Sequence, residues 1–220
     1  MNKQYNDLTD RIKISTPLST SAVLSIDNDN DIGMPAGSFK PELLENTIRP
    51  LLGFLGETGS PLMVNVNPIS NFDPEYLKGP WNPDYKGPGQ PRVAAEYYIC
   101  IFDTILDRFV EALNKEGYGS GRIRVLVTET GFPTDGEDHG GIGTSPFFSV
   151  GEKYIKEIAK EYHSIITSRV LNGTNLRPGV LSQVYLRSLF DEKWRAGEAY
   201  DQHYGIFRND GTKKYDINFN

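Results

Sequence analysis

Val125–Gly131, which reads Val-Leu-Val-Thr-Glu-Thr-Gly, is the stretch that decides the fold. Its β-branched and apolar residues run on without alternation until Glu129, as is typical of a buried strand in a parallel sheet. In an α/β barrel the carboxyl ends of the strands carry the catalytic groups. Glu129 therefore stands where a catalytic carboxylate would stand. The competing interpretation is that a glutamate after an apolar run only marks where a strand meets water.

Apolar runs alternate with amphipathic runs along the rest of the chain. Strands are predicted at Arg11–Ser15, Pro61–Val66, Ile123–Thr128 and Val180–Phe190. Helices are predicted at Pro41–Leu55 (kinked at Pro50), at Ala94–Leu113 with a stop at Glu116-Gly117, and at Glu152–Val170. Strands separated by helices indicate βα units and a parallel sheet. Four such units are too few to close an eight-stranded barrel.

Composition bounds the classes of function. The 220 residues suit one domain, and 38% apolar with 24% charged residues is ordinary for a globular protein. The net charge of −6 and the pI near 5.2 argue against nucleic acid or an anionic membrane as a partner. No run approaches the ~20 apolar residues of a membrane span. Met1–Asp10 is polar, so no secretory signal is expected there, and the compartment stays open.

No metal or cofactor is expected from the residue spacing. Cys100 is the only cysteine and lies in an apolar helical run, which favours core packing over a nucleophile. The acidic residues at 27–31 open like a calcium loop, but Ser38 stands where the bidentate glutamate belongs. The histidines are scattered without ligand spacing and are interpreted as surface or packing residues: His139, His163 and His203.

Phe190–Arg195 follows the last predicted strand and holds carboxylates, cations and an indole within six residues. One interpretation is a charged helix start, because Asp and Glu favour the first turn of a helix. The other is a charge network beside Glu129, since both would lie at the carboxyl ends of neighbouring strands.

Six motifs occur in one order along the chain: Ile12–Thr16, Pro35–Phe39, Gly59–Val66, Thr128–Pro133, Phe190–Trp194 and Tyr204–Phe207. Together they resemble the plant endo-1,3-β-glucanases of glycoside hydrolase family 17. The resemblance implies a TIM-type (β/α)₈ glycosidase barrel of the α/β class. It assigns Glu129 the role of nucleophile in a retaining mechanism. It implies no cofactor, and its partner is a 1,3-β-glucan polysaccharide or oligosaccharide.

The resemblance also implies the rest of the site. Glu192 matches an acidic residue that the family holds near its nucleophile, and Arg195 stands where the family usually has lysine, so both join Glu129 as expected catalytic residues. Substrate binding is expected of five residues: Asn65, Asn67, Phe132, Tyr185 and Asp201.

Several of these positions depart from the family pattern. Asp201 stands in place of glutamate, Phe132 in place of tryptophan and Gln183 in place of glutamate. Asn67–Ile69 replaces a Tyr-Pro-Tyr run, which removes surface that could stack on a sugar.

Ile12–Ser15 resembles the fifth strand of the barrel, so residues 1–220 would form the C-terminal half of the catalytic domain. No residue matches the family's general acid, and hydrolysis would then be impaired. Open strand edges would favour a homo-oligomer. A non-catalytic glucan-binding protein and a truncated gene-model fragment remain as alternatives. Family members are secreted, extracellular or in the cell wall, whereas the compartment of this chain stays undecided.

Overall fold

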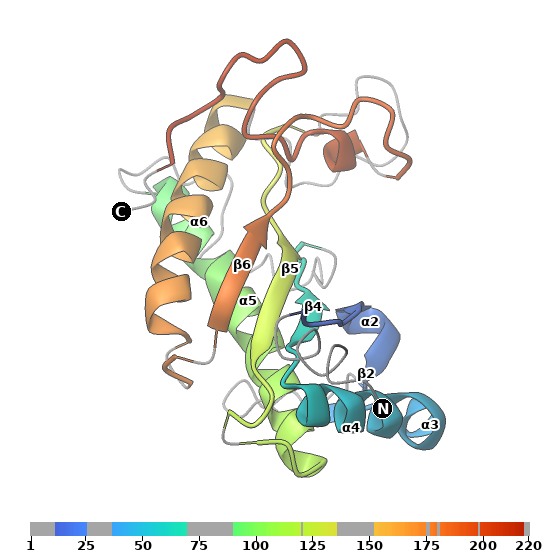
Figure 1. Ribbon diagram of the computed structural model, residues 1–220. Coiled ribbons are helices and arrows are strands. Elements are labelled where there is room, and N and C mark those ends of the chain that lie inside the picture. Colours follow the sequence, from blue (N-terminus) through green and yellow to red (C-terminus); the bar gives the residue numbers. More distant parts are fainter. Residues whose placement is uncertain are drawn as a thin grey trace. The chain divides into compact units, whose positions relative to one another are not determined.

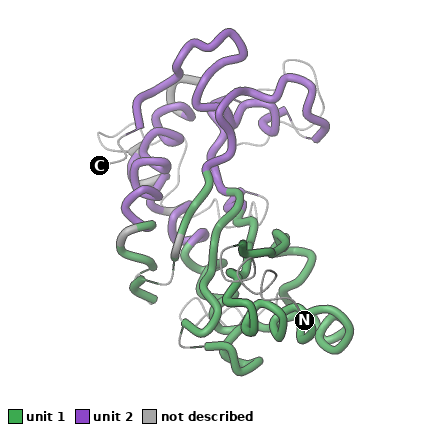
Figure 2. Tube along the Cα trace, viewed as in Figure 1, with its two compact units in different colours: residues 1–66, 103–129, 170–185 green, residues 67–102, 130–169, 186–220 purple. Residues whose placement is uncertain are grey.

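The computed structural model describes residues 12–25, 37–69, 90–119, 121–135, 152–174, 177–179, 181–197 and 199–217. The chain forms two compact units, coloured separately in Figure 2. Unit 1 comprises Met1–Val66, Asp103–Glu129 and Val170–Tyr185, and unit 2 comprises Asn67–Phe102, Thr130–Arg169 and Leu186–Asn220. The acidic run at 27–31 and His139 lie outside the described residues.

A four-stranded sheet is the framework of unit 1 (Figure 1). Its strands, in the order β1-β4-β5-β6, are Pro17–Ser19, Leu62–Asn65, Val125–Thr130 and Leu181–Leu186. The first and third of these strands both run parallel to β4. Helix α5, Gln90–Lys115, connects β4 to β5, and helix α6, Glu152–Asn172, connects β5 to β6. The predicted alternation of strands and helices is therefore confirmed.

The burial of the strands explains their sequences. Val125 and Val127 of β5 are 1% and 0% exposed, and Leu126 between them is 7% exposed. A strand with both faces covered needs apolar residues at every position, which is why this run does not alternate. In β4 the buried positions Leu62 and Val64 alternate with the half-buried positions Met63 and Asn65.

The first predicted strand was misplaced. Residues 12–16 have no regular structure, and Ile12 and Ile14 are 58% and 64% exposed. The strand begins instead at Pro17, a position where proline is tolerated because the first residue of a strand need not donate to the ladder. The last predicted strand, Val180–Phe190, is likewise shorter and ends at Leu186.

The helix predicted at Pro41–Leu55 is confirmed and extends to Thr58. It consists of α3 at Pro41–Leu43, a π-helical turn η1 at Leu44–Ile48, and α4 at Arg49–Thr58. Pro50 has no N–H and its ring would clash with the carbonyl four residues earlier. The wider π turn directly before it accommodates that ring, so the irregularity precedes the proline. Leu52 and Leu55 on α4 are fully buried.

A short antiparallel pair completes unit 1. Helix α2, Thr20–Val23, leads into β2, Leu24–Ser25, which pairs with β3, Ser38–Phe39. Leu24 faces Phe39 in this pair, and both side chains are buried.

The two long helices confirm their predicted positions, and one residue on them was misassigned. Gly117 ends α5 with φ of 81°, a left-handed conformation that glycine adopts without strain. Its N–H donates to the carbonyl of Asn114 at 3.0 Å. Cys100 on α5 is exposed, whereas the sequence favoured core packing. The apolar run around it leaves one helix face outside the core, and Cys100 lies on that face.

Aromatic rings form the core of unit 2. Phe132 is 0% exposed and lies between Tyr98 of α5 and Tyr162 of α6, with ring centroids 4.7 Å and 5.7 Å apart. His163 follows on α6 and stacks on Tyr215 at 5.8 Å. Phe190–Arg195 does not begin a helix, and the next element is the 3₁₀ turn η4 at Ala199–Gln202. Among the described residues, no helix is long and apolar enough to cross a membrane.

Candidate active site

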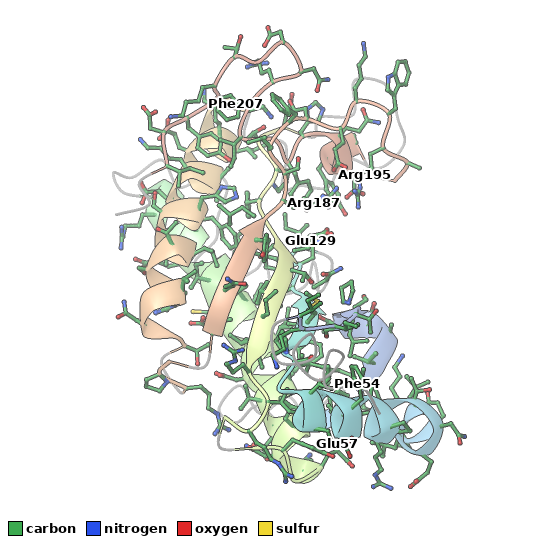
Figure 3. The ribbon with its side chains drawn as sticks, in the orientation of Figure 1. Phe54, Glu57, Glu129, Arg187, Arg195 and Phe207 are labelled. Carbon is green, nitrogen blue, oxygen red and sulfur yellow. The ribbon has the colours of Figure 1, made fainter. Side chains whose placement is uncertain are left out.

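A β-bulge in β5 sets the position of Glu129 in unit 1. Val64 pairs with Val127, but the next residue of β4, Asn65, pairs with Glu129. Thr128 is therefore an extra residue in the ladder, and bulges of this kind re-aim the side chain that follows them. Glu129 lies at the carboxyl end of β5 and is half-buried (Figure 3).

Hydrogen bonds hold the bulge and the neighbouring strand end together. The Thr128 hydroxyl donates to Oδ1 of Asn65 at 2.7 Å and to the Val64 carbonyl at 3.2 Å. The Thr20 hydroxyl donates to the backbone carbonyl of Asn65 at 3.0 Å. The Glu129 carbonyl accepts from the Val66 N–H at 2.9 Å. The backbone on both sides of the Glu129 carboxylate is thus fixed, which is what a preorganised nucleophile needs.

The glycine that ends the motif is required by close backbone packing in unit 2. A Cβ on Gly131 would lie 2.1 Å from the Arg187 carbonyl oxygen and 3.1 Å from Cδ1 of Tyr204. The Arg187 N–H donates to the Thr130 carbonyl at 2.7 Å, so the two backbones run directly against each other there. Any side chain at position 131 would separate them.

Phe132, which was expected to contact substrate, lies in the interior of unit 2. Its ring is fully buried in the aromatic core of that unit, which does not support a stacking contact with a sugar. The residue instead anchors the start of the loop after β5. An aromatic side chain directly after a strand-end motif is compatible with either role, and only the packing of α5 and α6 distinguishes them.

A charged cluster in unit 2 is built on Arg187, which is 8% exposed. Its Nε donates to Glu192 at 3.3 Å, and its Nη2 donates to the Asp201 carbonyl at 3.0 Å and lies 3.6 Å from the Asp201 carboxylate. The guanidinium carbon lies 4.1 Å above the ring of Tyr204. Arg195 approaches the Glu192 carboxylate from solvent, at 3.2 Å from each oxygen. Glu192 is therefore held by two arginines.

The cluster also affects a buried phenol. Burial raises the pKa of Tyr204 well above its usual range, although the positive charge of Arg187 acts in the opposite direction. Asn67, another residue of unit 2, also opposes the rise in the pKa of Tyr204. The Oδ1 atom of Asn67 accepts from the Ile69 N–H at 3.0 Å. Tyr204 stays a neutral hydroxyl at any physiological pH.

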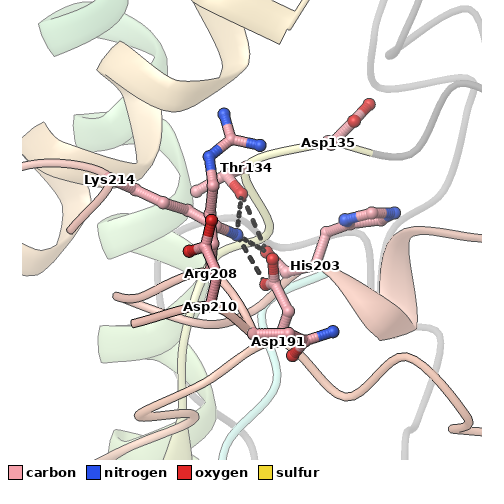
Figure 4. A pocket seen from close by; sticks show the side chains of 8 residues that line it. Thr134, Asp135, Asp191, His203, Arg208, Asp210 and Lys214 are labelled. Carbon is pink, nitrogen blue, oxygen red and sulfur yellow. Dashed lines mark hydrogen bonds and ion pairs between the residues drawn. The ribbon is translucent and has the colours of Figure 1, made fainter. Parts of the chain in front are cut away.

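Two hollows open in unit 2. One, of about 290 Å³, lies around the buried pair of Lys214 and Asp191 and is shown in Figure 4. The other, of about 550 Å³, is lined by Asp191–Arg195 of the loop after β6 and by Asn209, which follows η4.

The structure brings some of the expected site residues together. In unit 2 it joins Glu192, Arg195 and Asp201 through Arg187. In unit 1 it pairs Asn65 with Glu129 across the strands, and Tyr185 on β6 is 55% exposed.

Arg187 was not anticipated from the sequence. It is the one cation inside the predicted strand Val180–Phe190, and an arginine within an apolar run signals a buried ion pair. That signal was available, but nothing local indicated that the partners would be Glu192 and Asp201.

The comparison with protein families decides the identity of the chain. The profile described as Glycosyl hydrolases family 17 matches residues 1–219. The chain belongs to this family. The resemblance stated from six motifs is thereby confirmed.

Two curated relatives show how much of a family 17 protein this chain spans. Glucan endo-1,3-beta-glucosidase 11 of Arabidopsis thaliana is 29% identical over 220 residues, covering 96% of this chain and 47% of the relative. The acidic isoform GL161 of glucan endo-1,3-beta-glucosidase from Nicotiana tabacum is 30% identical over 231 residues, covering all of this chain and 61% of the relative. The chain thus spans between 47% and 61% of their lengths.

The fold agrees with family 17 structures. CJP38, a beta-1,3-glucanase and allergen of Cryptomeria japonica pollen, superimposes with a TM-score of 0.71 at 25% identity, covering 98% of this chain and 61% of that one. One of two plant beta-glucan endohydrolases with distinct substrate specificities gives a TM-score of 0.67, also at 25% identity, covering 94% of this chain and 61% of that one. The predicted α/β fold of the TIM-barrel glycosidase type is confirmed.

Proposed function

We propose that this chain is the C-terminal half of a glycoside hydrolase catalytic domain that cleaves 1,3-β-glucan with retention, and that Glu129 is its nucleophile. The observation that carries the proposal is the bulge at Thr128, which presents the Glu129 carboxylate at the end of β5, opposite Asn65. Membership of family 17 and the names of the relatives supply the substrate class.

In this mechanism the Glu129 carboxylate attacks the anomeric carbon while the glycosidic C–O bond breaks, and the leaving oxygen takes up the proton that the family's general acid would donate. Water then hydrolyses the glycosyl ester, which releases the sugar and restores the carboxylate. The step requires an ionised carboxylate whose backbone does not move. The hydrogen bonds of Thr128 and Val66 on either side of Glu129 support that requirement.

Glu192 and Arg195 have supporting roles in the proposal. Two arginines hold the Glu192 carboxylate, so it accepts hydrogen bonds in a fixed direction and suits recognition of sugar hydroxyls. Asn65, Asn67, Tyr185 and Asp201 are proposed to contact the glucan, whereas Phe132 is withdrawn from that set because its ring is buried.

The test uses a leaving group that needs no proton, since no residue in this sequence matches the family's general acid. The full 220-residue chain is mixed with a 2,4-dinitrophenyl β-glucoside, and dinitrophenolate release is followed by absorbance. Glu129→Gln is expected to lower the rate at least ~1,000-fold, because nucleophilic attack is lost while a near-isosteric side chain keeps the fold.

Glu57→Gln is the matched control, because Glu57 is an exposed carboxylate in the same unit, on α4 (Figure 3). Its rate should equal that of the unmodified chain. A 2-deoxy-2-fluoro glucosyl fluoride should also leave a sugar adduct on the peptide that contains Glu129, detected by mass spectrometry. Equal rates for Glu129→Gln and the unmodified chain would show that another group attacks. Binding of the glucan without any turnover would favour the non-catalytic alternative.

A further inference from the structure

Trp194 is the most exposed large apolar side chain in the described part of the chain, at 90%. It belongs to the loop between β6 and η4 in unit 2. Its unit buries other large rings almost completely, among them Tyr98, Phe132 and Tyr204. An indole carries a large apolar surface, so leaving it in water forgoes stabilisation that a core position would provide.

The surroundings of Trp194 combine one aromatic surface with hydrogen-bonding groups. The hollow of about 550 Å³ that it lines falls in the size range of small-molecule sites. Carboxylates, two cations and an amide share the lining with the indole: Asp191, Glu192, Lys193, Arg195 and Asn209.

The polar rim of this hollow is fixed in advance. Arg187, 8% exposed, holds Glu192 from inside at 3.3 Å, while Arg195 holds both oxygens of Glu192 from outside at 3.2 Å. The N–H of Arg195 also donates to the Glu192 carbonyl at 2.8 Å, which closes a tight turn around Lys193 and Trp194. Because these side chains are already held in place, binding a ligand costs little further side-chain entropy in the protein.

We propose that Trp194 is a stacking platform for a glucosyl ring of a β-glucan, with Glu192 and Arg195 hydrogen-bonding the hydroxyls at the edge of that ring. The proposal rests on the glucan hydrolase function proposed above and adds a binding subsite to it. A β-glucopyranose ring carries its hydroxyls equatorially, so its faces present C–H groups that pack on an indole, while its edge needs donors and acceptors. The hollow offers both.

Charge separates this occupant from the other ligands that stack on tryptophan. The two cations of the lining, Lys193 and Arg195, are matched by Asp191 and Glu192, so the hollow offers no excess positive charge to hold the phosphates of a nucleotide, and the net charge of −6 repels them overall. A neutral oligosaccharide meets no such repulsion. Lys193 places its ammonium 5.4 Å from the centroid of the indole ring, within the range of a cation–π contact.

The sequence allows a direct optical test, because it contains only two tryptophans, Trp81 and Trp194. Trp81→Phe leaves Trp194 as the single indole, and Glu129→Gln in the same chain prevents turnover. Titration with laminarihexaose should then shift and quench the fluorescence to saturation. Sucrose at the same concentration should leave the emission unchanged.

Affinity is measured in parallel by calorimetry with Trp81 retained. Trp194→Ala should bind laminarihexaose about tenfold more weakly, and Trp194→Tyr should recover most of the loss because an aromatic face remains. Phe54→Ala is the control, since Phe54 is an exposed aromatic side chain of unit 1, at 42%. It should keep the unmodified affinity.

These measurements test stacking on Trp194 separately from the proposed role of Glu129 as the nucleophile. Unmodified affinity in Trp194→Ala, or no response of the single indole to the hexaose, overturns the platform even if Glu129-dependent dinitrophenolate release is intact. Weaker binding in Trp194→Ala together with release that does not depend on Glu129 supports the platform and overturns the proposed nucleophile.

Discussion

Lys214 donates to the carboxylate of Asp191 at 2.5 Å inside unit 2, with side chains only 3% and 12% exposed (Figure 4). The same ammonium reaches the Thr134 hydroxyl at 2.7 Å, and Asp191 also accepts from the Gly205 N–H at 3.0 Å. The pair therefore joins the last segment of the chain to the loops that follow β5 and β6. Burial lowers the pKa of Lys214, and Asp191 counteracts that effect.

Lys214→Met is expected to lower the free energy of unfolding by about 3–5 kcal/mol, because it leaves the Asp191 carboxylate buried without its cation. Lys213→Met is the adjacent control: Lys213 pairs with Asp216 where the side chains are 48% and 90% exposed, and its loss should leave the free energy of unfolding almost unchanged. Urea unfolding of both variants gives the two values. Equal costs would contradict a special role for the buried pair.

Arg187 and Arg195 both bind Glu192 but should contribute very differently to stability. Arg187→Met removes a buried cation from Glu192 and Asp201 and should cost about 3–5 kcal/mol in the free energy of unfolding. Arg195→Met removes an exposed one and should cost at most about 1 kcal/mol. Thermal and urea unfolding at neutral pH give the stabilities of the two variants for comparison. A small loss in Arg187→Met would show that the cluster does not hold the loop.

The sequence was sufficient where burial is periodic or continuous. The run that became β5 is apolar at every position because both faces of that strand are covered, and this pattern is visible without any knowledge of its neighbours. The helices α5 and α6 followed from their one-face repeats in the same way. The stop at Gly117 followed from local backbone chemistry.

The features that could not be predicted from the sequence are those that depend on contacts between distant segments. The bulge at Thr128 exists only because β5 meets β4, which lies more than 60 residues earlier. The clamp on Glu192 depends on Arg187 turning inward, and the burial of Phe132 depends on α5 and α6 together. Local patterns hold no information about such contacts, so the burial of Phe132 could not be anticipated when a substrate role was expected of it.

His163 should make stability fall in mild acid. Its Nδ1 lies 2.7 Å from the Ala159 carbonyl, which can only accept, so the proton of the neutral ring is assigned to Nδ1. Nε2 has no hydrogen-bond partner among the described residues. Complete burial lowers the pKa of His163 from 6.5 to about 4, because the cation would be desolvated.

The direction of this pH dependence follows from the number of protons that the folded and unfolded chains bind. Between pH 6.5 and about 4 the unfolded chain binds a proton at His163 that the folded chain does not, so the free energy of unfolding falls as the pH falls through this window. The contribution of this residue is about 3 kcal/mol across the window. His163→Phe keeps an aromatic ring and should lose that part of the pH dependence. His203→Gln should retain it, and an unchanged slope in His163→Phe would refute the assignment.

Gly131 should tolerate no side chain, because a neighbouring backbone occupies the space that a Cβ would need. A Cβ there would lie 2.1 Å from the Arg187 carbonyl oxygen, which is backbone and cannot rotate away. Gly131→Ala is therefore expected to push apart the segments that follow β5 and β6, at a cost of at least about 3 kcal/mol. Gly117→Ala is the matched control, since nothing lies within 4 Å of its Cβ position and only its φ of 81° opposes the change. It should cost about 1–2 kcal/mol. Urea unfolding distinguishes close approach from backbone strain, and a Gly131→Ala variant no less stable than Gly117→Ala would rule out the steric explanation of the motif glycine.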